Sequence, residues 1–129
     1  MDSNVILDVF TDDPIWCSWS GSHLDSCSST GPLYINAVIY GEVSIRFERI
    51  EQLESALPEE DFARLELPFE AAFLAGKAFR DYKSRGGTRT ATLPDFFIGA
   101  HAAVLGLNLL TRDDARFRTY FPTVKLISP

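Results

Sequence analysis

Four acidic residues are spaced so that a fold of alternating strands and helices would bring their carboxylates to one edge of a sheet. They are Asp2, Glu42, Asp95 and Asp113. Clustered carboxylates repel one another and raise each other's pKa, so a protein that gathers four of them usually does so to hold a divalent cation. Oxygen ligands suit Mg²⁺ or Mn²⁺, whereas Zn²⁺ favours His or Cys. The four acids therefore predict a magnesium or manganese site.

Each acid also has an ordinary structural explanation. Asp2 can be a turn residue, Glu42 can solvate a helix flank, and Asp95 can be the third residue of a capping box. Asp113 can be one of a loop pair with Asp114. These explanations, taken singly, do not account for four acids at the same predicted sheet edge. The metal site is therefore the favoured interpretation.

The elements that would position these acids are indicated by apolar spacing, turn residues and caps. Strands are expected at 33–35, 108–111 and 124–127. Helices are expected from Asp13–Pro14, Asn36 and Pro58, around Phe69–Phe79, and from Thr92, with Gly86–Gly87 and Gly106 ending the last two. This alternation implies a parallel sheet covered on both faces, and such sheets bind ligands beyond the carboxyl ends of their strands.

Apolar residues at helical spacing predict which helix faces are buried. Two helices are expected to face the core through Trp16, Trp19, His23 and Cys27, and through Ile39, Val43, Phe47, Ile50 and Leu57. Two later helices are organised by Phe69, Phe73, Gly76 and Phe79, and by Phe97, Ala100 and Val104. Glu42 lies in the row beside the second set, so it is expected at the edge of the core.

Length and composition fit one soluble domain. The chain has 129 residues, 46% of them hydrophobic, which predicts a single domain over 1–129. The sequence contains neither a run of about 18 apolar residues nor a signal-peptide pattern, so a cytoplasmic protein without a membrane segment is expected. Cys17 and Cys27 lack metal-ligand spacing and are interpreted as reduced, partly buried thiols. His23 and His101 are interpreted as helix-packing residues rather than catalytic bases.

The net charge of −6 counts moderately against a broad nucleic-acid surface. Basic residues are nevertheless concentrated in two short segments, and such groups can contact phosphates locally. The first contains Arg80, Lys83, Arg85 and Arg89, and the second contains Arg112, Arg116 and Arg118. A solvated surface explains any single Arg or Lys equally well, so both interpretations stay open.

The four acids lie within short motifs. These are Asp-Ser-Asn-Val at 2–5, Ile-Asn at 35–36 with Glu-Val at 42–43, Leu-Pro-Asp-Phe-Phe-Ile-Gly-Ala-His-Ala at 93–102, and Leu-Leu-Thr-Arg-Asp at 109–113. In this order the motifs resemble the PIN-domain family, in particular the VapC toxins of prokaryotic toxin–antitoxin pairs. Each motif is weak alone, but together they are specific, and the resemblance covers nearly the whole chain.

The resemblance implies a PIN-like three-layer α/β/α sandwich with a central parallel sheet. It implies a Mg²⁺- or Mn²⁺-dependent endoribonuclease that hydrolyses phosphodiester bonds of transfer or ribosomal RNA, leaving a 5′ phosphate and a 3′ hydroxyl. The catalytic and metal-binding residues would be Asp2, Glu42, Asp95 and Asp113, with Asp113 preferred to Asp114 because it directly follows Leu-Leu-Thr-Arg. The partners would be a small VapB-type antitoxin and a second copy of the chain in a homodimer.

Further residues acquire roles from the same resemblance. Asn4 would position Asp2 by hydrogen bonding, and Ser3, where the family more often has Thr, would keep a hydroxyl able to contact the phosphate. The weak candidates for RNA contacts are Arg80, Lys83, Arg85, Arg89 and Arg112.

The N-terminal residues give conflicting signals. Pattern alone predicts a strand at 5–10, whereas the resemblance makes Asp2 the end of a central strand and starts a helix at Asn4. We follow the resemblance. Only Met1 then stands where several apolar strand residues are expected, so either the natural start lies upstream or the sheet is incomplete.

Two other classes of protein could share these features. A non-catalytic PIN-like interaction module would have the same core without metal-dependent cleavage, although retention of all four acids argues against it. A phosphoacceptor receiver domain would need two adjacent acids after its first strand and a Lys after its last. Asp2-Ser3 and Asp113-Asp114 do not match that arrangement.

Overall fold

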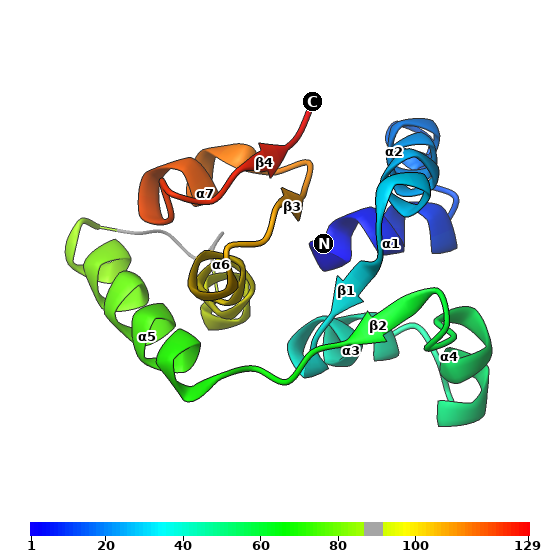
Figure 1. Ribbon diagram of the computed structural model, residues 1–129, viewed down its shortest axis with the longest axis horizontal. Helices are drawn as coiled ribbons and strands as arrows, with labels where there is room; N and C mark the ends of the chain where they lie inside the picture. Colours follow the sequence, from blue (N-terminus) through cyan, green and yellow to red (C-terminus); the bar gives the residue numbers. More distant parts are fainter. Residues whose placement is uncertain (87–91) are drawn as a thin grey trace.

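The computed structural model describes residues 1–86 and 92–129 and has an α/β fold with short parallel strands (Figure 1). The strands are β1 Leu33–Ile35, β2 Phe62–Arg64, β3 Leu109–Leu110 and β4 Leu126–Ile127. The helices are α1 Ser3–Phe10, α2 Cys17–Thr30, α3 Ala37–Ser44, α4 Ile50–Ala56, α5 Phe69–Ser84, α6 Leu93–Leu105 and α7 Asp114–Tyr120. β1 pairs in parallel with β2, and β3 pairs in parallel with β4. The predicted α/β class is confirmed, with the central sheet divided into two parallel pairs.

The first two residues lie between these two pairs of strands. The amino group of Met1 donates to the Tyr34 carbonyl at 3.2 Å, and the Asp2 amide donates to the Leu110 carbonyl at 2.8 Å. The N-terminus accordingly lies between β1 and β3 (Figure 1). Helix α1 begins directly afterwards at Ser3, so the helix expected from the resemblance is confirmed and the alternative strand at 5–10 is wrong.

Local capping chemistry sets several helix ends as expected. The Asn36 side chain accepts a hydrogen bond from the Ile39 amide at 3.0 Å at the start of α3. Asp95 accepts from the Thr92 amide at 3.0 Å in the capping box of α6. Helix α6 ends at Gly106, whose φ of 66° is the left-handed conformation that glycine adopts readily.

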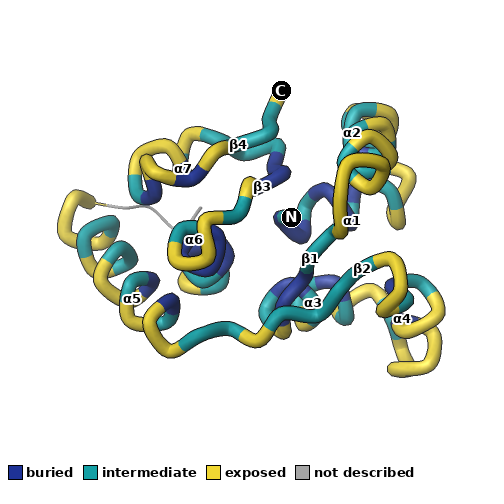
Figure 2. Tube along the Cα trace, in the orientation of Figure 1, coloured by how far each residue is buried: buried dark blue, intermediate teal, exposed yellow. Residues whose placement is uncertain are grey.

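Helix α6 lies at the centre of the molecule and packs against α5 and α3 (Figures 1 and 2). Its buried residues are Phe96, Ile98, Gly99, Ala100, His101 and Ala102. Gly99 permits a close approach, because a Cβ there would lie 2.4 Å from the Phe121 ring. Of the face expected to be buried, Ala100 is buried, but Val104 is 40% exposed.

Helix α2 starts later than predicted, and its aromatic stripe is not part of the core. Asp13 accepts hydrogen bonds from the amides of Ile15 and Trp16, both at 2.8 Å, and so caps a turn that precedes the helix. Ser20 is the buried residue of α2. The expected core residues Trp16, Trp19, His23 and Cys27 are only partly buried, because α2 turns its Ser20 face towards α1, where the hydroxyl meets Asp8.

The long helix expected after Asn36 is divided into α3 and α4. Ile39, Val43 and Leu57 are buried as expected, but Ile50 is 63% exposed at the start of α4. The helix predicted at Pro58 is also wrong. The amides of Asp61 and Phe62 donate to the Pro58 carbonyl in a single turn, after which the chain enters β2 and pairs with β1.

Helix α5 is confirmed, but two of its expected core residues, Phe69 and Phe73, point away from the core, whereas Phe79 packs against it. Phe69 is 91% exposed and Phe73 is 69% exposed, whereas Ala71 and Ala75 are fully buried. Small side chains let α5 approach neighbouring elements closely, so its apolar stripe is displaced from the face that packs. Helix α7 was not predicted from the sequence.

Two further expectations concern thiols and membrane segments. Cys17 and Cys27 are free, partly buried thiols, as expected. Within residues 1–86 and 92–129, no helix combines the length and apolar character needed to cross a membrane.

Candidate functional site

Asp2 is a buried acid whose side chain is held by one neighbour and repelled by another. Its Oδ2 accepts a hydrogen bond from the Thr111 hydroxyl at 2.8 Å, and the residue is only 4% exposed. Burial raises the pKa of Asp2, the Thr111 hydrogen bond opposes that rise, and the negative charge of Asp95 adds to it. Asp2 and Asp95 therefore lie close enough to interact although 93 sequence positions separate them.

Glu42 belongs to the same electrostatic group. Its Oε1 accepts a hydrogen bond from the Ser3 hydroxyl at 2.8 Å. Burial raises the pKa of Glu42, the Ser3 hydrogen bond opposes this, and the charges of Asp95 and Asp2 raise it further. The Ser3 hydroxyl therefore orients Glu42, and its contact with a phosphate stays a prediction.

Asp95 is fixed at the start of α6 by Thr92 before it and by the packing of Phe96 after it. Its Oδ2 accepts hydrogen bonds from the Thr92 amide at 3.0 Å and from the Thr92 hydroxyl at 3.2 Å. Phe96 is fully buried, and its ring centroid lies 5.4 Å from those of Phe79 and Tyr82. Asp95 is thus both the capping-box residue and a member of the acid group.

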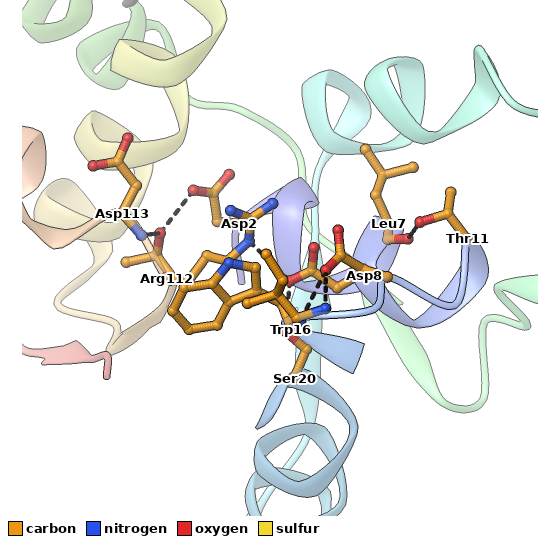
Figure 3. Close-up of polar contacts among 11 residues, drawn as sticks. Asp2, Leu7, Asp8, Thr11, Trp16, Ser20, Arg112 and Asp113 are labelled. Atoms are coloured by element: carbon orange, nitrogen blue, oxygen red, sulfur yellow. Dashed lines mark hydrogen bonds and ion pairs between the residues drawn. The ribbon is translucent and has the colours of Figure 1, made fainter. Parts of the chain in front are cut away.

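Thr111 connects Asp2 to the fourth predicted acid. Besides donating to Asp2, its Oγ1 accepts a hydrogen bond from the Asp113 amide at 3.1 Å (Figure 3). Thr111 is fully buried directly after β3. The sequence interpretation did not assign it a role, although a hydroxyl residue directly after the apolar pair Leu109–Leu110 is a usable signal.

Arg116 connects Asp113 to Asp95. Its Nη1 lies 3.2 Å from Oδ2 of Asp113 and 3.5 Å from Oδ2 of Asp95. Asp114 belongs to a different group, because it pairs with Arg118 at 2.9 Å and receives the Ser128 hydroxyl at 3.5 Å. Asp113, unlike Asp114, is thus joined to Asp95 through a shared arginine, and its role as the fourth metal ligand stays a prediction.

The expected hydrogen bond between Asn4 and Asp2 is not formed among the described residues. Asn4 Oδ1 is buried there without a hydrogen-bond partner, and Thr111 holds Asp2 instead. Thr111, and not Asn4, is therefore the residue that positions Asp2 by hydrogen bonding.

The acid group suits a hard cation in its chemistry and charge. Asp2, Glu42 and Asp95 are carboxylates from three separate segments, and their mutual repulsion is part of what raises the pKa of Asp2 and Glu42. Within residues 1–86 and 92–129, however, no three such side chains lie close enough to hold a metal ion as they stand. Electrostatic coupling acts over longer distances than coordination, so the side chains would have to turn towards a bound cation.

Arg112, a weak candidate for RNA contact, takes part in a buried ion pair, and its contact with RNA stays a prediction. Its Nε donates to Oδ2 of Asp8 at 2.9 Å, and its guanidinium lies 5.4 Å from the centre of a Trp16 ring (Figure 3). The Ser20 hydroxyl donates to the same Asp8 oxygen at 2.7 Å. Arg112 thereby ties the segment after β3 to α1 and α2.

The other basic candidates lie at the C-terminal end of α5. Arg80, Lys83 and Arg85 are exposed. Lys83 lies 5.6 Å from the centre of the Phe79 ring, and Arg85 pairs with Asp81 at 3.3 Å. Arg89 lies outside the described residues. RNA contact by this segment stays a prediction.

The four carboxylates come from different helices of an α/β fold with short parallel strands. Asp2 and Asp113 are the N-caps of α1 and α7, Asp95 lies in the first turn of α6, and Glu42 lies within α3. The model of the PIN domain family matches residues 1–121, and the chain belongs to this family.

Solved structures with this fold include three toxin–antitoxin complexes. VapBC2 from Rickettsia felis, bound to a promoter DNA fragment, has a TM-score of 0.74 at 16% identity, over 99% of this chain and 96% of that one. VapBC-1 from nontypeable Haemophilus influenzae has a TM-score of 0.73 at 19% identity, over 98% and 94%. A Klebsiella pneumoniae toxin–antitoxin complex has a TM-score of 0.67 at 21% identity, over 95% and 92%. No curated protein sequence matches significantly.

Proposed function

We propose that this protein is a Mg²⁺- or Mn²⁺-dependent endoribonuclease toxin of the VapC type that hydrolyses phosphodiester bonds in transfer or ribosomal RNA. One observation carries the proposal: in a PIN-family fold, carboxylates from three separate segments lie close enough that their negative charges add to burial in raising the pKa of Asp2 and of Glu42. Such repulsion costs stability unless a cation is bound, which is typical of a functional site rather than a structural one.

Three of the four proposed ligands accept a hydrogen bond from a hydroxyl that limits their orientation. Thr111 holds Asp2, Ser3 holds Glu42, and Thr92 holds Asp95. A bound Mg²⁺ or Mn²⁺ would supply Lewis acidity at the phosphate and activate a water molecule. The protein contributes the four carboxylates Asp2, Glu42, Asp95 and Asp113, held at fixed points on its backbone.

The proposal is tested by replacing Asp95 with Asn. Asn is nearly isosteric but a poor metal ligand, so Asp95→Asn should reduce RNA cleavage in Mn²⁺ by about 100-fold or more. Asn tolerates a helix start, so stability measured in chelator should change by about 1 kcal/mol at most.

Asp114→Asn is the matched control. It also removes one negative charge from the first turn of a helix, here α7. Asp114 pairs with Arg118 and does not belong to the proposed metal site. Its cleavage activity should stay close to that of the wild type. Full activity in Asp95→Asn would contradict the metal-site role of Asp95 and most of the nuclease proposal.

A non-catalytic PIN-like interaction module remains the alternative, and one observation favours it. No three metal-binding side chains are gathered within coordination distance in the described residues. This alternative predicts no Mn²⁺-dependent cleavage by the wild type, so the same assay separates the two functions.

We also propose a small VapB-type antitoxin as the partner. The similar structures are toxin–antitoxin complexes, and an under-neutralised acid group would accept a basic side chain from such a partner. A groove of about 660 Å³, lined partly by Tyr40, Ile50 and Leu67, offers apolar surface for its tail. Co-expression with the small reading frame next to the gene should yield a stable complex in the cytoplasm. Unchanged cleavage in its presence would show that this frame is not the antitoxin.

A homodimer is proposed as well. Phe69 and Phe73 present large exposed rings on α5, which a second copy would cover. Light scattering should give twice the mass of the chain, and Phe73→Asp should shift the protein towards a monomer. A wild-type mass equal to one chain would contradict the dimer.

A further inference from the structure

Arg116 lies between two of the four acids that the proposed function assigns to metal binding. One nitrogen, Nη1, lies 3.2 Å from Asp113 and 3.5 Å from Asp95, so a single cationic group is shared by two carboxylates from different helix starts. The Arg116 side chain is only 16% exposed. Its charge is therefore directed at the acid group rather than at solvent.

The Arg116 guanidinium lies between two proposed metal ligands, Asp95 and Asp113, where a bound cation is also expected. Asp95 interacts with Asp2 and Glu42 electrostatically, so a positive charge beside Asp95 offsets part of the repulsion among all three. A guanidinium and a divalent cation repel each other and compete for the same carboxylate oxygens. Binding of a metal by Asp95 and Asp113 therefore requires Arg116 to move away from them.

We propose that Arg116 is an internal counter-ion of the acid site, which holds Asp95 and Asp113 in the metal-free protein and is displaced when a divalent cation binds. The proposal rests on the proposed function, because it takes the four acids to be the metal ligands. It makes Arg116 a residue that sets the metal concentration at which the site fills. The sequence placed Arg116 only in a basic segment, although its position three residues after Asp113 on a helix is a signal for such a pair.

Arg116 is shared by two carboxylates rather than committed to one. Its ion pairs with Asp113 and Asp95, at 3.2 and 3.5 Å, are longer than the 2.9 Å contact between Arg112 and Asp8. Longer charge pairs are weaker, so each of these two carboxylates can exchange Arg116 for a divalent cation.

The experiment compares Mn²⁺ binding by the wild type, Arg116→Gln, Arg116→Lys and Arg118→Gln, using electron paramagnetic resonance of free Mn²⁺. Removal of the competing charge should tighten Mn²⁺ binding in Arg116→Gln by about tenfold. Arg116→Lys keeps the charge and should bind close to wild type. Arg118→Gln removes the same charge two residues away, where Arg118 pairs with Asp114, and should not change Mn²⁺ affinity.

Thermal unfolding in chelator gives a second readout without metal or activity. Arg116→Gln should melt below the wild type there, because the acids lose their cation, and added Mn²⁺ should raise its melting temperature more than that of the wild type. Unchanged or weaker Mn²⁺ binding in Arg116→Gln would overturn the proposal and leave Arg116 as a group that orients the acids or contacts RNA.

The outcomes separate this proposal from the nuclease proposal. If Mn²⁺ binding tightens as expected while Asp95→Asn still cleaves RNA, the counter-ion role stands and the nuclease site is wrong. If none of the four proteins binds Mn²⁺, the metal site and the displacement of Arg116 both fail. If Arg116→Gln binds Mn²⁺ and the wild type does not, Arg116 competes strongly enough to keep the metal out, which supports the proposal.

Discussion

Two arginines, four residues apart, face carboxylates in different ways. Arg112 donates to Asp8 at 2.9 Å, Ser20 donates to the same oxygen at 2.7 Å, and the Asp8 side chain is 3% exposed. Arg116 is instead shared between Asp95 and Asp113 at 3.5 and 3.2 Å. The first group balances one charge with one charge, whereas the second offers one cation to a larger set of acids.

The difference shows that burial alone does not distinguish a structural ion pair from a binding site. Asp2 and Asp8 are both buried, at 4% and 2% exposure. Asp8 meets a guanidinium and a hydroxyl, whereas Asp2 meets the Thr111 hydroxyl and the repulsion of Asp95. The number of cationic groups per carboxylate therefore distinguishes a binding site from a structural ion pair better than the burial of the carboxylate does.

The largest expected effect on stability comes from breaking the Arg112–Asp8 pair. Arg112→Leu leaves the Asp8 carboxylate buried beside Ser20 alone, and such a loss should lower the free energy of unfolding by about 3 kcal/mol. Urea unfolding in chelator measures this change. Arg118→Leu, which breaks an exposed pair on α7, is the control and should cost about 0.5 kcal/mol or less. Equal losses in the two variants would mean that the Arg112–Asp8 pair is no more structural than a surface contact.

A smaller effect is expected at Thr111, which links Asp2 to Asp113. Thr111→Val keeps the shape but removes the hydrogen bonds to Asp2 and from Asp113, which should cost about 1–2 kcal/mol of stability. The Thr111 hydrogen bond also lowers the pKa of Asp2, so its loss should raise that pKa further. Asp2 then stays protonated to a higher pH, and the acid limb of the cleavage profile should move upwards.

Thr111→Ser serves as the control for this substitution because it keeps the hydroxyl group. Its stability and acid limb should lie near those of the wild type. An acid limb that does not move in Thr111→Val would show that Asp2 does not govern the pH dependence of cleavage.

Local sequence chemistry was enough to predict several features of the fold. Asn36 at the start of α3, the capping box at Asp95 and Gly106 at the end of α6 were all predicted correctly, because each depends on residues within a few positions. The order of the four acids predicted one group at a sheet edge. The charges of Asp95 and Asp2 act on Glu42 and that of Asp95 on Asp2, but no three metal-binding side chains of the described residues lie within coordination distance.

Features that depend on distant residues were missed. Pro58 and the acids after it are compatible with a helix start, but pairing with β1 makes the following residues a strand. The Arg112–Asp8 pair joins positions 104 residues apart. Phe69 and Phe73 have helical spacing, yet Ala71 and Ala75 are the buried residues of α5. Which helix face is buried depends on the neighbouring elements, and a single sequence does not contain that information.

The smallest expected effect concerns a buried polar pair without charge. The Asn36 side-chain amide lies 2.9 Å from Nδ1 of His101, and Asn36 Oδ1 already accepts from Ile39, so the amide NH₂ donates to a neutral imidazole. Burial lowers the pKa of His101, and the nearby amino group of Met1 lowers it further. Because the folded pKa is below that of the unfolded chain, the stabilisation is present above the unfolded value of 6.5 and is lost as the pH falls below it.

The acid group changes stability in the opposite direction, because Asp2 and Glu42 have raised pKa values and destabilise the fold as pH rises. Comparison of the wild type with His101→Gln removes this common contribution, since both proteins keep the acids. Melting temperatures are measured in chelator near pH 7.5 and 5.5. Acidification should destabilise the wild type more than it destabilises His101→Gln, by a difference of about 1 kcal/mol or less. Identical pH dependence in both proteins would show that folding does not lower the pKa of His101, and that the Asn36–His101 pair does not favour the uncharged imidazole.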